Sequence, residues 1–363
     1  MGGEDGEGLA GGSGGSAGSG TGDGGVGSSR GGGGGGGNGA GRSKKGKEGQ
    51  GKKNGGKNGK NGGKNGGKNG KKYNRAARKE EGKETIRIAK EGSVNGIDIA
   101  AECAYPEENR VLYDPADDVV AEWDAMRETR EVVYETSITV TSESSMQAAR
   151  RLDDLLRDEG YVQGEEERPP SVCVLSFASA KNPGGGVLTG SKAQEEDLCR
   201  QTALYRALLG APGYAINKKK DGRGMYTDHM VYVPIVPVFR NADGSLIADR
   251  QELRLVSFVS SAAVNAGRLS KNRQGEVVDA LERRADRILA AMALHGHTHI
   301  VLGAWGTGVF KNDPTTIAEI FASALESPRF SGVFSHVCFA VLSNPDRPDR
   351  TRSAFEAVFP AQM

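Results

Sequence analysis

The sequence predicts an α/β domain with a largely parallel or mixed central sheet and helices on both faces. Short apolar segments typical of strands alternate with helical segments of ten or more residues between Ser137 and Phe359, the pattern of sheets that helices cover. Two of the apolar segments run directly into glycine-containing loops, where ligands of such sheets bind. Glycine is also concentrated in the first seventy residues, which separates a tail from the domain.

Residues 1–72 are predicted to be a disordered, low-complexity tail. Most of the 55 glycines lie there, and large apolar side chains that could offset the entropy of ordering the backbone are nearly absent. A Gly-Lys-Asn-Gly unit recurs between Lys44 and Lys72 and has no apolar face with which to stack. The tail is basic and the remainder mildly acidic. A solubilising spacer is favoured over a weak contact with a polyanion, and residues 73–363 are expected to form one domain.

The domain is expected to begin with a helix over Asn74 to Lys90, which is rich in Lys, Arg, Glu and Ala. Ser137 to Thr141 is rich in β-branched residues, as strands are. Ser142 is then expected to cap a helix from Ser145 to Asp158.

The middle of the chain supplies the expected central strand. Ser171 to Phe177 is continuously apolar without alternation, which is typical of a strand covered on both faces. Ala193 to Leu208 has helical spacing, ended by the glycine at Gly210. Val231 to Ile247 indicates a hairpin at the sheet edge, because its prolines would break the ladder of a central strand.

The remaining elements follow the same two periodicities. The expected strands are 253–259, 299–302 and 336–342, and the expected helices are 277–294, 315–325 and 351–359.

Composition excludes several classes of protein. No run approaches the roughly 20 apolar residues of a membrane-spanning helix, and the N-terminus lacks the apolar core of a secretory signal. The four cysteines are scattered, without a pair spaced for metal binding or a dense disulfide framework. A soluble, intracellular protein is expected, with nucleus and cytoplasm left open and with no cofactor or metal.

The two glycine-containing loops suggest a diphosphate held from two sides. The first spans residues 178–187 and the second residues 303–310. Glycine lets backbone N–H groups approach phosphate oxygens closely. The alternative, that each loop merely turns the chain, is favoured for either loop alone. Neither loop matches a P-loop or a dinucleotide-binding fingerprint, which excludes ATPase and dehydrogenase interpretations.

The segment Gln194-Glu195-Glu196 begins the helix after the first loop and suggests acid chemistry. In an α-helix the two adjacent carboxylates point roughly 100° apart. One of them can therefore act on a bond held in the glycine-containing loop, while the other has an orienting role. Cleavage of a glycosidic bond needs a proton on the leaving oxygen, usually from a carboxyl group. The alternative is a solvated helix N-terminus, where Glu suits the dipole. The helix dipole favours the ionised carboxylate, which opposes the raised pKa that a proton donor needs. The charge of Glu195, burial or the phosphates of the substrate could each raise this pKa.

Together these motifs resemble poly(ADP-ribose) glycohydrolases of the compact microbial type. The resemblance covers residues 74–360 in the same order and is carried by Arg78 to Glu91, Gly184-Gly185-Gly186, Gln194-Glu195-Glu196, Tyr226-Thr227-Asp228-His229 with the following Pro234 to Phe239, and Gly303 to Pro314. It implies a macrodomain-like fold of three layers with ADP-ribose between the two loops. Thr307 stands where many relatives have Cys, with little effect expected because loop backbone does the binding.

The resemblance also implies roles for individual residues. Glu196 would be the general acid that protonates the leaving ribose oxygen and then activates water, and Glu195 would hold ribose hydroxyls. Substrate contacts are implied for Asn182, Gly184, Gly185, Gly186, Val187, Gln194, Gly306, Thr307, Gly308, Val309 and Phe310.

The implied function is cleavage of the ribose–ribose bond of poly(ADP-ribose), from the chain end, by a monomer. Poly(ADP-ribose) or ADP-ribosylated proteins would be its partners, with weak polyanion contact through the tail. A second possibility is a non-catalytic reader of ADP-ribose, which the intact Glu195 and Glu196 oppose. A third is a nucleic-acid protein acting through its tail, which the acidic domain does not favour.

His295, His297 and His299 could share one face of a strand and bind zinc. No carboxylate or Cys ligand lies nearby in sequence, and the segment is away from the expected loop tips. A metal role is therefore disfavoured.

Overall fold

The computed structural model describes residues 74–158, 172–220, 223–344 and 348–360. The predicted tail over residues 1–72 lies outside the described residues. The described ranges include both glycine-containing loops and the Gln194-Glu195-Glu196 segment. No helix in these ranges is long and apolar enough to cross a membrane.

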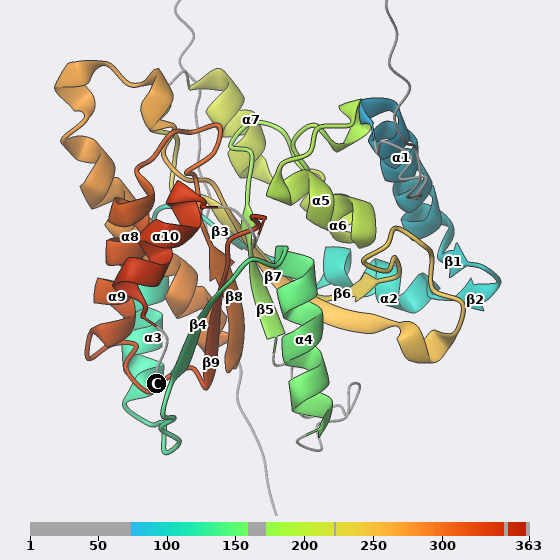
Figure 1. Cartoon of the computed structure of the whole chain (residues 1–363), viewed down its shortest axis with the longest axis horizontal. Coiled ribbons are helices and arrows are strands. Elements are labelled where there is room, and N and C mark those ends of the chain that lie inside the picture. Colours follow the sequence, from blue (N-terminus) through green and yellow to red (C-terminus); the bar gives the residue numbers. More distant parts are fainter. Residues whose placement is uncertain (1–73, 159–171, 221–222, 345–347, 361–363) are drawn as a thin grey trace, which may run out of the picture. The chain divides into compact units, whose positions relative to one another are not determined.

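A mixed sheet of seven strands organises the described residues (Figure 1). The strands β7, β5, β8, β9 and β4, which are neighbours in that order, run parallel to one another, whereas β6 is antiparallel to its neighbours β3 and β7. A separate hairpin pairs β1 (Ser93–Val94) with β2 (Ile97–Asp98). In spatial order the sheet contains β3 (Val111–Tyr113), β6 (Met230–Val238), β7 (Arg254–Ser261), β5 (Val172–Phe177), β8 (His299–Gly303), β9 (His336–Ala340) and β4 (Ser137–Thr141).

Helices cover both faces of this sheet (Figure 1), which confirms the predicted three layers. One face carries α3 (Val119–Arg127), α8 (Glu276–Leu294), α9 (Pro314–Glu326) and α10 (Arg350–Val358). The other carries α1 (Arg75–Glu91), α2 (Ala100–Glu108), α4 (Ser145–Asp158), α5 (Gln194–Gln201) and α6 (Leu204–Leu208). A further helix, α7 (Pro212–Lys219), follows α6.

The continuously apolar strand β5 explains the two helical layers. Val172 and Val174 pack into the core beneath α1, α4 and α5, whereas Cys173 and Leu175 pack into the core beneath α3, α8 and α9. Successive strand side chains point to opposite faces, so such a strand needs cover on both. Because β5 and β8 are parallel neighbours, the glycine-containing loops that follow them meet at one edge of the sheet.

The prediction of an edge hairpin over Val231 to Ile247 was wrong for β6, which lies inside the sheet between β3 and β7. The proline argument still holds locally, because β3 pairs only with residues 230–232 of β6. Pro234 and Pro237 lie in the other half of the strand, which among the described strands pairs only with β7. The ladder shifts register between Val233 and Val236, and Ile235 adopts a φ of 50°.

The single helix predicted over residues 193–208 is broken into α5 and α6. Thr202 is extended and forms a bridge with Val238. The helix breaks here because backbone groups of this segment hydrogen-bond to the end of β6: the Phe239 N–H donates to the Gln201 carbonyl.

The capping residue predicted for α4 was also wrong. Ser144 caps α4 in place of Ser142, because its hydroxyl accepts from the Gln147 N–H (3.3 Å) while the Gln147 side chain accepts from the Ser144 N–H (2.9 Å). This reciprocal pair is a capping box.

Candidate active site

The first glycine-containing loop leaves β5 and folds back on itself. Gly184 and Gly185 have φ of 64° and 57°, left-handed values that cost residues with a Cβ about 1–2 kcal/mol. The Gly185 N–H donates to the Asn182 carbonyl (3.0 Å), and the Val187 N–H donates to the Gly184 carbonyl (3.1 Å). A Cβ on Gly184 would lie 2.5 Å from the Tyr205 ring. Glycine is therefore required here by both backbone and space.

The carboxylate of Glu195 holds this loop against the start of α5. One oxygen accepts from the Ser179 N–H (2.6 Å) and the other from the Gly184 N–H (3.0 Å), and the residue is only 3% exposed. Burial raises the pKa of Glu195 well above its usual value, and the nearby charge of Glu196 raises it further. Both oxygens thus bind the loop, and Glu195 also lines the cleft, so its implied contact with ribose hydroxyls stays a prediction.

The carboxylate of Glu196 has a different environment. Its Oε1 accepts from the Gly186 N–H (2.8 Å), while its Oε2 has no hydrogen-bond partner within the described part of the chain. A Cβ on Gly185 would lie 2.5 Å from Oε1, so the bare glycine backbone leaves room for this carboxylate. Glu196 thus presents one oxygen that can exchange a proton with a bound molecule.

The side chain of Gln194 fixes where α5 begins. Its Oε1 accepts from the Phe177 N–H (2.9 Å), and its Nε2 donates to the Leu175 carbonyl (2.8 Å) and the Ser145 hydroxyl (3.1 Å). The end of β5, the start of α4 and the start of α5 are thereby joined. Gln194 therefore sets the position from which the two carboxylates project.

Helix α1 braces the far end of the first loop. Arg75 donates to the Thr189 carbonyl (2.8 Å), and Arg78 donates to the Gly190 carbonyl (3.0 Å). The Val187 side chain, 1% exposed, lies against Gly82 of α1. The loop is therefore held by α5 on one side and by α1 on the other.

The second loop is shaped by Trp305 and Asn312. The Trp305 indole N–H donates to the Ser261 carbonyl (3.0 Å), and the residue is fully buried. The Asn312 amide donates to the carbonyls of Val264 (2.7 Å) and Gly306 (3.0 Å). Gly306 has a φ of 73°, and a Cβ there would lie 2.5 Å from both Ala263 and Asn312. The loop is thereby fixed in a conformation that only glycine fits.

The tip of the second loop carries unused hydrogen-bond donors. Within the described residues, the N–H groups of Gly308, Val309 and Phe310 donate to no protein acceptor. Successive backbone N–H groups of this kind form binding sites for phosphate oxygens. The anion site that the sequence predicts thus has its free donors in the second loop, whereas the Gly185, Gly186 and Val187 N–H groups are already bonded.

The two loops and the start of α5 enclose a cleft of about 760 Å³, the size of pocket that holds small-molecule ligands. A second cavity of about 500 Å³ adjoins it and shares the walls formed by Phe177, Gln194, Ala304 and Thr307. Together they form one elongated site along the edge where the parallel strands end.

Nearly all of the residues proposed from the sequence line this cleft. They are Asn182, Gly185, Gly186, Gln194, Glu195, Glu196, Gly306, Thr307, Gly308, Val309 and Phe310. The exceptions are Gly184, whose free side faces Tyr205, and Val187, whose side chain faces α1. These two shape the loop from behind and do not face the cleft.

The cleft also contains residues that were not singled out. Ala178, Ser179, Ala304 and Trp305 lie within the two loops, so position in the loop was the available signal. Ala263 follows β7 and had no sequence signal, because only the strand pairing of β7 with β5 brings it to this edge.

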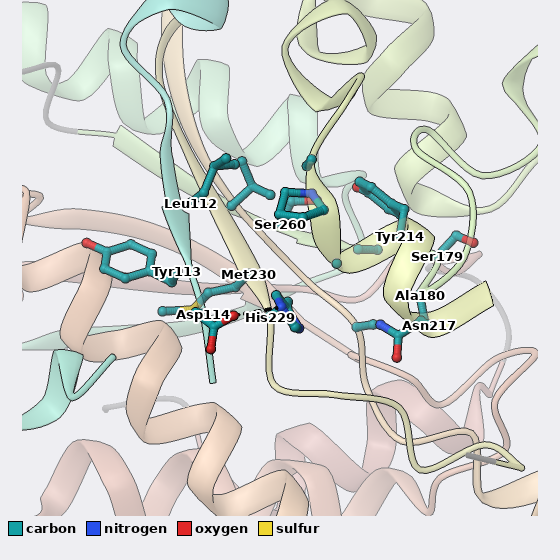
Figure 2. Close-up of a pocket in the computed structure, with 16 residues that line it drawn as sticks. Leu112, Tyr113, Asp114, Ser179, Ala180, Tyr214, Asn217, His229, Met230 and Ser260 are labelled. Atoms are coloured by element: carbon teal, nitrogen blue, oxygen red, sulfur yellow. Dashed lines mark ion pairs between the residues drawn. The ribbon is translucent and has the colours of Figure 1, made fainter. Parts of the chain in front are cut away.

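A smaller cavity of about 80 Å³ lies beside the cleft and shares Ala178 and Ser179 with it (Figure 2). His229 is close to Asp114 in its wall, with 3.1 Å between Nε2 and the carboxylate (Figure 2). This cavity has room for a few water molecules, so it is not the main ligand site.

The histidines of residues 295–299 serve the core. His295 stacks on Tyr232 with 3.5 Å between ring centroids, and His297 hydrogen-bonds the Tyr232 hydroxyl (3.0 Å). His299 stacks on His336 at 4.5 Å. In the part of the chain that the structure describes, no group of three or more His, Cys, Asp or Glu side chains is arranged to hold a metal ion.

Comparison with known proteins identifies relatives of this site. The family model described as the catalytic domain of microbial-type PARG matches residues 82–241. The poly(ADP-ribose) glycohydrolase structure from Thermomonospora curvata is similar, with 36% identity, a TM-score of 0.67, and 78% of this chain and 100% of that chain covered. A search of curated proteins found no match.

Two similar structures contain ligands. One is the Thermomonospora curvata enzyme bound to the inhibitor ADP-HPD, with 36% identity, a TM-score of 0.65, and 78% of this chain and 99% of that chain covered. The other is poly(ADP-ribose) glycohydrolase from Deinococcus radiodurans with ADP-ribose, with 36% identity, a TM-score of 0.61, and 72% of this chain and 98% of that chain covered.

Proposed function

The chain belongs to the microbial-type poly(ADP-ribose) glycohydrolase family, and from this we propose that it hydrolyses the ribose–ribose O-glycosidic bond of poly(ADP-ribose) from the chain end, releasing ADP-ribose. The observation that carries the proposal is the geometry of Glu196. One oxygen is fixed by the Gly186 N–H, and the other has no hydrogen-bond partner among the described residues, while the side chain lines the cleft.

The tip of the second loop suits the diphosphate of the substrate. The free N–H groups of Gly308, Val309 and Phe310 offer donors without a charged side chain, which suits a domain whose overall charge does not attract polyanions. Asn182 and Phe310 both line the cleft, and in the proposed arrangement Phe310 packs beside the ribose and Asn182 binds a ribose hydroxyl. We assign the adenosine end to the adjoining cavity of about 500 Å³, because the cavity that shares Ala178 and Ser179 with the cleft has a volume of only about 80 Å³.

The reaction then follows from the two carboxyl groups. Glu196, protonated on Oε2, gives its proton to the leaving ribose oxygen as the bond to the anomeric carbon breaks and oxocarbenium character develops. The Glu196 carboxylate then takes a proton from the water that attacks that carbon. Glu195 keeps the first loop in place throughout through its bonds to Ser179 and Gly184, so we assign it a positioning role.

The biological setting is also part of the proposal. Four free, buried cysteines suit a reducing, intracellular compartment. We expect a monomer acting on poly(ADP-ribose) or ADP-ribosylated proteins, with residues 1–72 as a spacer that adds at most a weak polyanion contact. Deleting those residues should leave the rate of ADP-ribose release nearly unchanged, whereas a large loss would assign the tail to substrate capture.

The proposal is tested by substituting Glu196→Gln, because Gln keeps an acceptor for the Gly186 N–H but cannot donate a carboxylic proton. We expect ADP-ribose release from poly(ADP-ribose) to be abolished while ADP-ribose binding, measured by calorimetry, is retained. Glu131→Gln, at an exposed position away from the cleft, serves as the control.

Binding of ADP-ribose by the wild type without any release from the polymer would support the alternative, a non-catalytic reader. Full activity of Glu196→Gln would show that the proton donor is another residue.

A further inference from the structure

The segment Tyr226-Thr227-Asp228-His229 resembles the family but lies outside the walls of the cleft. Each of its residues is tied to a different part of the fold. Thr227 donates through its N–H (3.0 Å) and its hydroxyl (3.2 Å) to the Asn217 amide oxygen on α7. The His229 ring bonds the Thr227 hydroxyl (2.8 Å) and faces Asp114 (Figure 2). The number of contacts made by these four residues indicates that the segment holds a neighbouring part of the structure in a defined position.

Tyr226 is the residue of this segment that reaches the cleft wall from behind. Its ring packs against the ring of Phe310, with 5.9 Å between centroids and 47° between planes. It also packs on a small cluster formed by Ala178, Ala180 and Ala262. Ala178 and Ala180 belong to the first loop and Phe310 to the second, so the ring of Tyr226 packs between a cluster that includes first-loop residues and the second loop.

The backbone of Tyr226 is held in an unfavourable conformation. Its φ is 56°, a left-handed value that non-glycine residues rarely adopt. Such a conformation persists only where the surroundings enforce it, and it is a pointer to function.

The side chain of Arg284, on α8, holds the backbone of Tyr226 in this conformation. Its side chain, 2% exposed, donates to the carbonyls of Met225 (2.7 Å), Tyr226 (3.2 Å) and Ala262 (3.0 Å). Its charge is balanced by Asp228 at 2.6 Å, which Arg283 also contacts at 2.7 Å. Because a buried guanidinium must satisfy its donors, Arg284 fixes the carbonyls on both sides of Tyr226.

We propose that Tyr226 is a positioning residue for the reaction: locked by Arg284, it holds Phe310 against the ribose and keeps the two loops at a fixed separation. This inference rests on the proposed function, since it takes Phe310 to contact the bound ribose. Tyr226 itself does not touch the substrate. Its removal should therefore weaken ADP-ribose binding through Phe310 without altering the proton donor.

The experiment compares Tyr226→Gly, Tyr226→Ala and Tyr226→Phe in the full chain. Glycine accepts a φ of 56° without strain, so Tyr226→Gly removes the ring without adding backbone strain. We expect both Tyr226→Gly and Tyr226→Ala to bind ADP-ribose roughly 3- to 10-fold more weakly, the range for loss of one aromatic pair. KM for poly(ADP-ribose) should rise by a similar factor with a smaller change in kcat. Tyr226→Phe, which keeps the ring, should restore binding.

Two controls separate positioning from a general structural role. Tyr134→Ala removes another partly buried tyrosine, one that contacts Arg130 away from the cleft, and should leave binding unchanged. In a Phe310→Ala background, Tyr226→Gly should have no further effect, because the two residues act as one unit.

If the wild type binds ADP-ribose and Tyr226→Gly binds it with the same Kd, this inference is overturned but the proposed function is not. Failure of the wild type to bind ADP-ribose would overturn the proposed function with it. Full additivity in the Phe310→Ala background would show that Tyr226 acts by another route.

Discussion

The substitution Gly185→Ala tests whether the first loop and the Glu196 carboxylate are fitted to one another. The new Cβ would lie 2.5 Å from Glu196 Oε1 and 3.1 Å from Glu195 Oε2, whereas ordinary contacts begin at 3.4 Å. The Glu196 carboxylate would therefore have to retreat by about 0.9 Å. A misplacement of about 1 Å in an active site costs on the order of 100-fold in rate, so kcat should fall by about that factor. The left-handed φ of 57° adds about 1–2 kcal/mol of lost stability.

The assay is release of ADP-ribose from poly(ADP-ribose) at saturating substrate, with the free energy of unfolding measured in urea. Gly96→Ala is the matched control, because Gly96 has a φ of 82° but no atom within 4 Å of the added Cβ. Both variants should lose similar stability, and only Gly185→Ala should lose kcat. A kcat for Gly185→Ala within about threefold of wild type would refute the reasoning, since the carboxylate would then tolerate the displacement.

The remaining predictions concern the stability of the elements around the site. Burial, with a smaller contribution from the charge of His336, lowers the pKa of His299 to about 4. The folded state thus favours neutral His299, so stability present above pH 6.5 should decline as pH falls toward 4, by up to about 3 kcal/mol. His299→Gln should flatten this dependence in urea denaturation at stepped pH; an unchanged slope would assign the loss to other groups. Gln194→Met removes three hydrogen bonds and should cost roughly 2–4 kcal/mol of unfolding free energy, together with a measurable drop in kcat. Wild-type stability would mean that α5 is anchored elsewhere.

The sequence predicted those parts of the fold that have local causes. Helices of a dozen residues or more, such as α4 and α8, repeat their apolar residues often enough to be recognised. Both glycine-containing loops follow continuously apolar strands, and their placement at one edge follows from parallel pairing. The Gln194-Glu195-Glu196 segment was recognisable because its residue types and spacing from the loop are unusual together.

Features with long-range causes escaped prediction. The short elements β1, β2, α2, β3 and α3 have two to nine residues each, too few for a periodic signal. The break at Thr202 depends on Val238, which lies far along the chain. The attachment of Glu195 to Ser179 and Gly184 likewise needs three-dimensional proximity. No local pattern indicates that Arg284 of α8 fixes the backbone at Tyr226.

The attachment of the first loop to α5 has a consequence for the thermodynamics of ligand capture. Ordering the backbone of one residue costs about 1–2 kcal/mol in conformational entropy, and a loop that orders only on binding subtracts that cost from affinity. Here the carboxylates of Glu195 and Glu196 already hold Ser179, Gly184 and Gly186. The entropy is therefore lost when the chain folds, before any ligand arrives. The same two acidic residues that face an anionic ligand thus also favour its association, through a preorganised loop.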